Sequence, residues 1–177
     1  MTISLQDVES VLRRTSAVDD SVPAPTLRQW RTELVRTSVF VSYAIGVLSL
    51  DAEVLAHAGT TSGEDALQSI VDDLPGLLAG GWVGGGWSLS PDASASIAAA
   101  AEVAADESEG LLGLHAEMAT CDFDDAEVVA DLLSRVEEQR QALTERRITL
   151  EERIRQIQEI VLRQYASGAA SVDDWLN

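Results

Sequence analysis

The chain has 177 residues, of which 46% are hydrophobic and only 5% aromatic. This composition supports a packed core, argues against global disorder and favours helices over sheets. All twelve basic residues are arginine, and the formal net charge is −18. Such a negative field repels nucleic acids and anionic membranes and attracts basic partners, so we expect no direct binding to DNA or to membranes.

The negative charge is concentrated in the middle of the chain. Residues 37–134 hold seventeen acids and no arginine, whereas the two flanking stretches are nearly balanced. Cys121 is the only cysteine, which excludes an intrachain disulfide and suggests a reducing compartment. The most apolar run, Ser38 to Leu50, has thirteen residues, and a spanning helix needs roughly twenty. We therefore expect a soluble cytoplasmic protein without a signal peptide.

The first quarter of the chain predicts a short helix, a linker and then a long helix. Residues 4–14 have an amphipathic pattern, and the following residues up to 25 contain two prolines. Thr26 and Gln29 fit a capping box at the start of a helix that runs to about residue 58. We treat residues 1–25 as a separate N-terminal segment. In the long helix one apolar row recurs every seven residues: Leu27, Leu34, Val41, Leu48 and Leu55.

The region between residues 59 and 123 reads as an acidic insert. Residues 64–78 predict a shorter helix, the glycine-rich stretch 80–87 predicts a loop, and residues 111–118 return to a helical pattern. Asp124, with Glu127 three residues later, predicts the cap of a final helix that ends near residue 166.

The final helix has a hydrophobic seam that turns polar in its middle. Heptads with two apolar positions specify a coiled coil. Arg140 and Arg147 occupy seam positions where that rule requires an apolar side chain. A buried, unpaired guanidinium is costly, so these arginines must meet a carboxylate, a ligand, a partner or water. The two rows are Val129, Val136, Leu143, Leu150 and Ile157, and Leu133, Arg140, Arg147, Ile154 and Val161.

Two long helices with heptad seams in one chain predict an all-α fold. The simplest arrangement is an antiparallel two-helix coiled-coil hairpin of residues 26–58 and 124–166. Shorter helices and a glycine-rich loop would lie between them. The hairpin domain then covers residues 26–176 and includes the acidic insert 59–123.

No residue pattern indicates catalysis or a metal site. His57, His115 and Cys121 are isolated and lack paired metal-ligand spacing, so we expect neither an enzyme nor a metalloprotein. The more informative set shares one face of the final helix, at spacings of four, three, four and four: Arg140, Thr144, Arg147, Glu151 and Arg155. This set fits a solvated notch with register-setting ion pairs, or a site for an anionic ligand or a partner protein.

Four stretches of the chain carry a likeness to a known family: Ser42–Tyr43, Asp73–Ala79, Val136–Leu143 and, most specifically, the C-terminal residues from Tyr165 to Leu176. In these stretches, which occur in the same order, the chain resembles the RsiG-type anti-sigma factors of actinobacteria, the aerial mycelium formation protein family. The resemblance implies an antiparallel two-helix coiled coil that binds a flagellar or sporulation type sigma factor. It also implies two motifs, Glu-x3-Ser-x2-Arg-x3-Gln-x3-Asp, that together bind cyclic di-GMP.

Both motifs are eroded in this sequence. The first copy keeps Ser42 and has Glu53 in place of aspartate; the second keeps Arg147 and has Thr144 in place of serine. Buried polar ligand sites tolerate such losses poorly, so we expect a sigma-binding scaffold without dependence on cyclic di-GMP and without another cofactor. The alternatives are a structural homodimeric coiled coil and a sensor of another anionic ligand at the arginine cluster. Candidate partner-binding residues are Trp30, Leu34, Trp82, Trp87 and Trp175.

Overall fold

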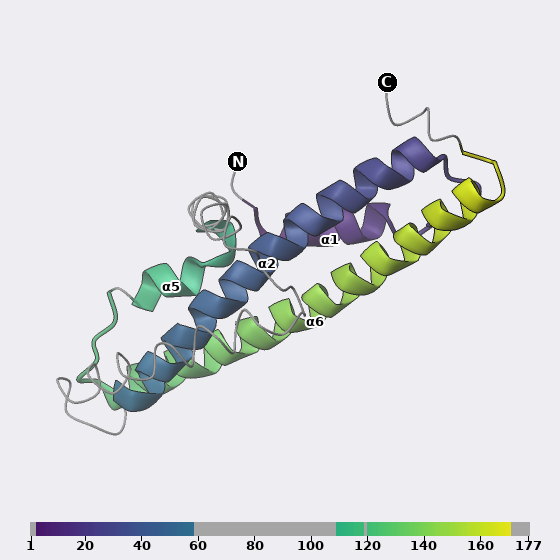
Figure 1. Cartoon of the computed structure of the whole chain (residues 1–177). Coiled ribbons are helices and arrows are strands. Elements are labelled where there is room, and N and C mark those ends of the chain that lie inside the picture. Colours follow the sequence, from purple (N-terminus) through teal and green to yellow (C-terminus); the bar gives the residue numbers. More distant parts are fainter. Residues whose placement is uncertain (1–2, 59–108, 119, 171–177) are drawn as a thin grey trace, which may run out of the picture. The chain divides into compact units, whose positions relative to one another are not determined.

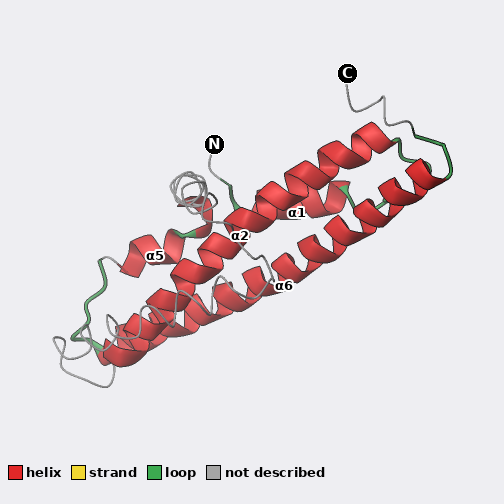
Figure 2. Ribbon diagram, in the orientation of Figure 1, coloured by secondary structure: helices red, strands yellow, loops and turns green. Residues whose placement is uncertain are grey.

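The described residues of a computed structural model, 3–58, 109–118 and 120–170, are helical apart from short connections. Two long helices, α2 and α6, pack together (Figure 1), and no strand occurs in these three ranges (Figure 2). The prediction of an all-α fold built on two long helices is confirmed. The predicted helix 64–78 and the glycine-rich loop 80–87 lie outside the described residues. The elements are α1 (Leu5–Arg14), α2 (Ala24–Ala58), the 3-10 turn η1 (Glu109–Leu111), α5 (Gly113–Met118) and α6 (Ala126–Ala166).

Helix α2 begins two residues before the predicted start. The Leu27 amide donates to the Pro23 carbonyl at 3.1 Å, so Thr26 already lies inside the first turn. Pro25 is tolerated there because the first-turn amides have no intrahelical acceptor to lose. The capping box predicted at Thr26 is therefore wrong, whereas the predicted end near residue 58 is confirmed.

Helix α6 is capped by Asp125, one residue after the predicted cap. Its Oδ1 accepts from the amides of Glu127 at 3.0 Å and Val128 at 3.3 Å, the pattern of an N-cap side chain. At the other end Gly168 has a φ of 75°. This left-handed conformation favours glycine and terminates the helix.

The chain divides into two compact units, and both long helices pass through each. Unit 1 comprises Met1–Ser4 and Phe40–Thr144, and unit 2 comprises Leu5–Val39 and Glu145–Asn177. As far as the structure describes them, unit 1 contains η1, α5, the second half of α2 and the first half of α6. Unit 2 contains α1, the first half of α2 and the second half of α6.

The main apolar row of each long helix is buried as predicted. The five residues of the α2 row and the five of the α6 row have at most 3% of their surface exposed. Burying each such side chain contributes on the order of 1.5–3 kcal/mol. Both heptad patterns therefore identify core positions. The rows are Leu27, Leu34, Val41, Leu48 and Leu55, and Val129, Val136, Leu143, Leu150 and Ile157.

The companion row of α6 is shifted by one residue from the prediction. Leu132 and Ile160 are buried at 3% and 6% exposure, whereas Leu133 and Val161 stay partly exposed. Leu132 and Leu133 are both apolar, so the repeat alone did not distinguish the two rows. Between Leu132 and Ile160 the row contains Gln139, Arg146 and Arg153, which are half-buried like Arg140 and Arg147 of the predicted row.

Judged by length and composition alone, helix α2 is long and apolar enough to cross a membrane. It is the one helix in the described ranges that meets this criterion. Core helices of soluble proteins and N-terminal signal sequences meet the same criterion. The expectation that its apolar run is too short to span is thus not supported, and cytoplasmic localisation is taken up below as a proposal.

Candidate functional site

The predicted ligand residues are distributed over both units. Unit 1 contains Ser42, Glu53, Arg140 and Thr144, and unit 2 contains Arg147, Glu151 and Arg155. Within each unit the polar contacts of Arg140, Thr144 and Arg147 are formed with groups one turn away on α6 itself. The set is therefore described unit by unit.

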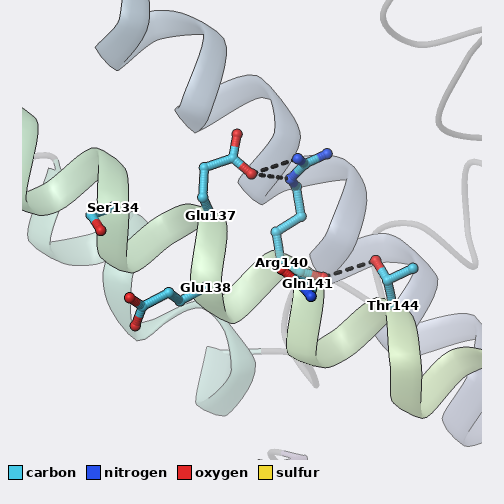
Figure 3. A pocket seen from close by; sticks show the side chains of 6 residues that line it. All are labelled: Ser134, Glu137, Glu138, Arg140, Gln141 and Thr144. Atoms are coloured by element: carbon cyan, nitrogen blue, oxygen red, sulfur yellow. Dashed lines mark hydrogen bonds and ion pairs between the residues drawn. The ribbon is translucent and has the colours of Figure 1, made fainter.

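In unit 1, Arg140 is paired with a carboxylate one turn earlier on the same helix. Its Nε donates to Glu137 Oε2 at 2.9 Å, and its Nη2 contacts the same oxygen at 2.5 Å. Thr144 Oγ1 donates to the Arg140 carbonyl at 2.8 Å (Figure 3). Ser42 is half-buried and Glu53 is exposed, and neither has a hydrogen bond to Arg140 or Thr144 among the contacts resolved here. Arg140 is thus engaged without any ligand.

A shallow hollow of about 400 Å³ surrounds this pair, and all its lining residues come from α6 (Figure 3). Glu137 and Glu138 contribute two carboxylates, whereas Arg140 is the single cation in the lining. An anion entering here would have to displace Glu137 from Arg140 and then face Glu138. The hollow therefore disfavours an anionic ligand.

In unit 2, Arg147 is also held on α6. Its Nε is buried and lies 3.7 Å from Glu151 Oε1, without a hydrogen-bond acceptor in the described ranges. Arg155 and Glu151 are exposed. Glu151 and Arg155 therefore face solvent, and these three residues of one helix do not enclose a cavity by themselves.

The arginines of the observed companion row contact groups that the sequence did not predict as their partners. In unit 2, Arg146 Nη2 contacts Glu9 Oε1 of α1 at 2.8 Å, and Arg153 Nη1 donates to the Ser16 carbonyl at 3.2 Å. The N-terminal segment thus provides acceptors for arginines that an isolated two-helix seam would leave unpaired.

The turn after α1 fastens the end of α6 in the same unit. Gln164, which is buried, donates from Nε2 to the carbonyls of Asp20 at 3.0 Å and Val22 at 2.8 Å. Arg163 contacts the Asp20 carboxylate at 3.2 Å. Arg28 of α2 donates to the Tyr165 hydroxyl at 2.9 Å. The predicted segment 1–25 thus contacts α6 in unit 2 through Glu9, Ser16, Asp20 and Val22.

Unit 1 contains a buried carboxylate that the sequence reading missed. Asp51 of α2 is 3% exposed, and both of its oxygens contact His115 Nδ1 of α5, at 2.9 and 3.0 Å. Burial raises the pKa of Asp51, and the hydrogen bond and charge of His115 oppose that rise. Its position seven residues after Ala44, a core residue, was a signal available in the sequence.

A second ion pair joins α5 to α6 in unit 1. Glu117 and Arg135 form two contacts of 2.6 Å. The hydrogen bond from Arg135 lowers the pKa of Glu117, and Glu117 raises the pKa of Arg135. Together with the Asp51–His115 pair, this contact attaches α5 to both long helices.

The predicted partner-binding residues fall into three groups. Leu34 is fully buried, so it belongs to the core and is not presented to a partner. Trp30 is half-buried. Trp82, Trp87 and Trp175 lie outside the described residues. The most exposed large apolar side chains on the long helices are Val39, Ile148 and Leu162, at 47%, 49% and 61%.

Comparison of the chain with protein-family models, with curated proteins and with solved structures gave no match.

Proposed function

We propose that this protein is a non-enzymatic regulator of the anti-sigma type. In this proposal α2 and α6 form an antiparallel hairpin coiled coil that binds and occludes a flagellar or sporulation type sigma factor in the cytoplasm. The resemblance of the C-terminal residues to the RsiG-type family motivates the choice of partner. The packing of two long helices supports the scaffold.

The observation that carries the proposal is the contrast between engaged arginines and exposed apolar side chains. Arg140 is hydrogen-bonded to Glu137, so a nucleotide phosphate at Arg140 would have to break an existing ion pair. Arg147 has a looser ion pair, 3.7 Å from Glu151. Ile148 and Leu162 meanwhile project from α6 with about half or more of their surface exposed. Exposed apolar side chains on a long helix suit a protein groove better than a nucleotide.

The charge of the two units supports a basic partner. Within the described residues, unit 1 holds eleven acids and two arginines, whereas unit 2 holds nine acids and ten arginines. Sigma factors expose basic surfaces that contact DNA. An acidic unit 1 would accelerate encounter with such a surface, and the rate would fall as salt screens the charges.

Co-purification tests the proposed partner. The full-length protein, tagged and expressed in its native cell, is expected to retain a sigma factor identified by mass spectrometry. An I148D/L162D double variant should lose it, because both substitutions place charge on the exposed apolar positions. T149D/Q158D, which adds the same two charges at exposed polar residues of α6, is the matched control and should retain the partner. Capture of no sigma factor by the wild type would refute the proposal.

Calorimetry with cyclic di-GMP tests nucleotide independence. The isolated wild-type protein is expected to give no binding heat at micromolar concentrations. Binding at micromolar affinity or tighter would contradict the proposal. E137Q, which frees Arg140, provides a positive comparison for weak anion binding.

Sedimentation and vesicle flotation separate the remaining alternatives. A stable homodimer that retains no sigma factor would favour the structural coiled-coil module. Flotation with vesicles of zwitterionic lipid is expected to leave the protein in the soluble fraction. Partition into the vesicle fraction would instead favour a membrane role for α2.

A further inference from the structure

The short segment of η1 and α5, residues 109–118, is attached to both long helices of unit 1. The Leu111 carbonyl accepts from Gln139 Nε2 of α6 at 2.7 Å, and the Leu111 side chain is fully buried. Glu117 pairs with Arg135 of α6 at 2.6 Å. His115 is the contact to α2, through Asp51. Three polar contacts and one buried leucine therefore hold the segment.

Asp51 occupies a position where an apolar residue would pack better. It lies in the buried row of α2 with Ala44, seven residues earlier, and only 4% of its side chain is exposed. Burying a carboxylate is unfavourable unless it is paired and hydrogen-bonded. Among the described residues, His115 is the one side chain within hydrogen-bond distance of this carboxylate. The His115 side chain itself is 50% exposed.

We propose that Asp51 and His115 form a pH-sensitive clip that holds the segment 109–118 closed on α2 when the imidazole is charged and loosens it when the imidazole is neutral. Histidine changes charge between about pH 5 and 8. A charged imidazole donates a charge-assisted hydrogen bond to the carboxylate, which is roughly twice as strong as the bond from a neutral ring. This inference concerns unit 1 alone and does not rest on the identity of the partner.

The other charged groups on the packed elements do not reproduce this behaviour. Besides Asp51 and His115, the packed elements of unit 1 carry Glu109 on η1, Glu117 on α5, Glu53 and His57 on α2, and Glu127, Asp131, Arg135, Glu137, Glu138 and Arg140 on α6. The pKa of Glu117 is lowered and that of Arg135 is raised by their mutual contact, so this pair stays charged near neutral pH. Glu53 is exposed, and His57 Nδ1 contacts the Glu53 backbone carbonyl at 2.9 Å, not a carboxylate.

Burial raises the pKa of Asp51, so this carboxyl takes up a proton at a higher pH than an ordinary aspartate. Protonation removes the cost of burying its charge. The carboxyl itself therefore does not oppose closure as the pH falls.

Opening would alter the surface of unit 1. Leu111 would leave its buried position, and Gln139 would lose its carbonyl acceptor. Gly110 packs so closely on the N-terminal backbone that a Cβ at this position would lie 2.7 Å from the Ile3 carbonyl oxygen. Loosening of the segment is thus expected to release residues 3 and 4 as well.

Hydrogen exchange of the full-length protein at pH 6 and pH 8, corrected for the intrinsic pH dependence of exchange, tests the clip. Peptides covering residues 110–118 are expected to exchange roughly fivefold faster at pH 8, the difference between a charge-assisted and a neutral hydrogen bond. H115Q should exchange fast at both pH values. H115K, which keeps a positive charge throughout, should exchange slowly at both.

The matched control is H57Q, which removes the other histidine in the same unit and should keep the wild-type profile. Peptides of α6 beyond residue 145 serve as an internal reference for global folding. A wild-type profile that does not change between pH 6 and 8, or a pH response that persists in H115Q, would overturn the proposal. If H115Q does not fold, a pH response that persists in H115K would also overturn it, and a flat, slow H115K profile would support it.

Discussion

Arg153 of α6 donates a hydrogen bond to the backbone carbonyl of Ser16, at 3.2 Å. This contact ties the middle of α6 to the chain just after α1, within unit 2. The acceptor of this companion-row arginine thus comes from the N-terminal segment and not from α2. The N-terminal segment therefore supplies an acceptor to a polar position of α6 within unit 2.

The register of α6 is tested by two adjacent leucines. L132A is expected to lower the free energy of unfolding by about 2–4 kcal/mol, because Leu132 is buried and its truncation leaves a cavity. L133A removes the same atoms from a partly exposed position and should cost about 1 kcal/mol. Urea titration followed by circular dichroism measures both. Equal costs, or a larger cost for L133A, would restore the register read from the heptads.

The carboxylate of Asp51 gives stability a defined pH dependence. The pKa of Asp51 is raised in the folded state. The contribution of this carboxyl to the free energy of unfolding is therefore fully present below its unfolded pKa and is lost as pH rises through its folded pKa. The unfolding free energy of D51N relative to wild type should therefore increase from pH 4 toward neutral pH. At pH 8 the variant is expected to be as stable as wild type or more stable by about 1 kcal/mol.

Chemical denaturation at several pH values measures this difference. E53Q, two residues away and exposed, is the control and should show no comparable trend. A D51N variant that loses stability relative to wild type as pH rises would show that the His115 contact outweighs the cost of burial.

Gln164 fastens the turn before α2 to the end of α6. Q164A leaves the carbonyls of Asp20 and Val22 without their amide donor, and unsatisfied buried groups cost about 1–3 kcal/mol. Hydrogen exchange and limited proteolysis of residues 17–24 should both accelerate. Q158A, at an exposed position of the same helix, should leave them unchanged.

Variants of two neighbouring aspartates test which residue caps α6. D125A is expected to cost about 1 kcal/mol, because it removes the acceptor of the Glu127 and Val128 amides. D124A should cost clearly less, since the Asp124 backbone amide, and not its side chain, makes the contact to Asp122. Thermal unfolding of the two variants measures the difference, and the reverse order would place the cap one residue earlier.

Local patterns predicted the elements well where the relevant information lies within a few turns of chain. The apolar rows that start at Leu27 and Val129 are the buried ones, and the ends of both long helices near residues 58 and 166 agree with the structure. Errors of one or two residues occurred where neighbouring residues were equally suitable. Asp124 and Asp125 can both cap a helix, and Leu132 and Leu133 can both line a seam.

The candidate sites were harder to predict because their partners are distant in the chain. The Asp51–His115 contact spans 64 residues, and the sequence showed His115 only as an isolated histidine. Arg140 and Arg147 drew attention as seam arginines, but in the structure each pairs with a carboxylate on its own helix. A one-residue change of register rotates a side chain by about 100°, which puts Arg146 and Arg153 in the row that contains the buried Leu132 and Ile160.

The sequence by itself determined that this chain forms two long helices with apolar seams, because helix periodicity and termini depend on nearby residues. Only the tertiary structure decided which neighbours satisfy the polar positions of those seams. Glu9, Ser16 and Asp20 reach α6 from the N-terminal segment, and His115 reaches Asp51 from α5. Such pairings follow from how the segments pack in space, since burying a charge is tolerated only where a complementary group is brought to it.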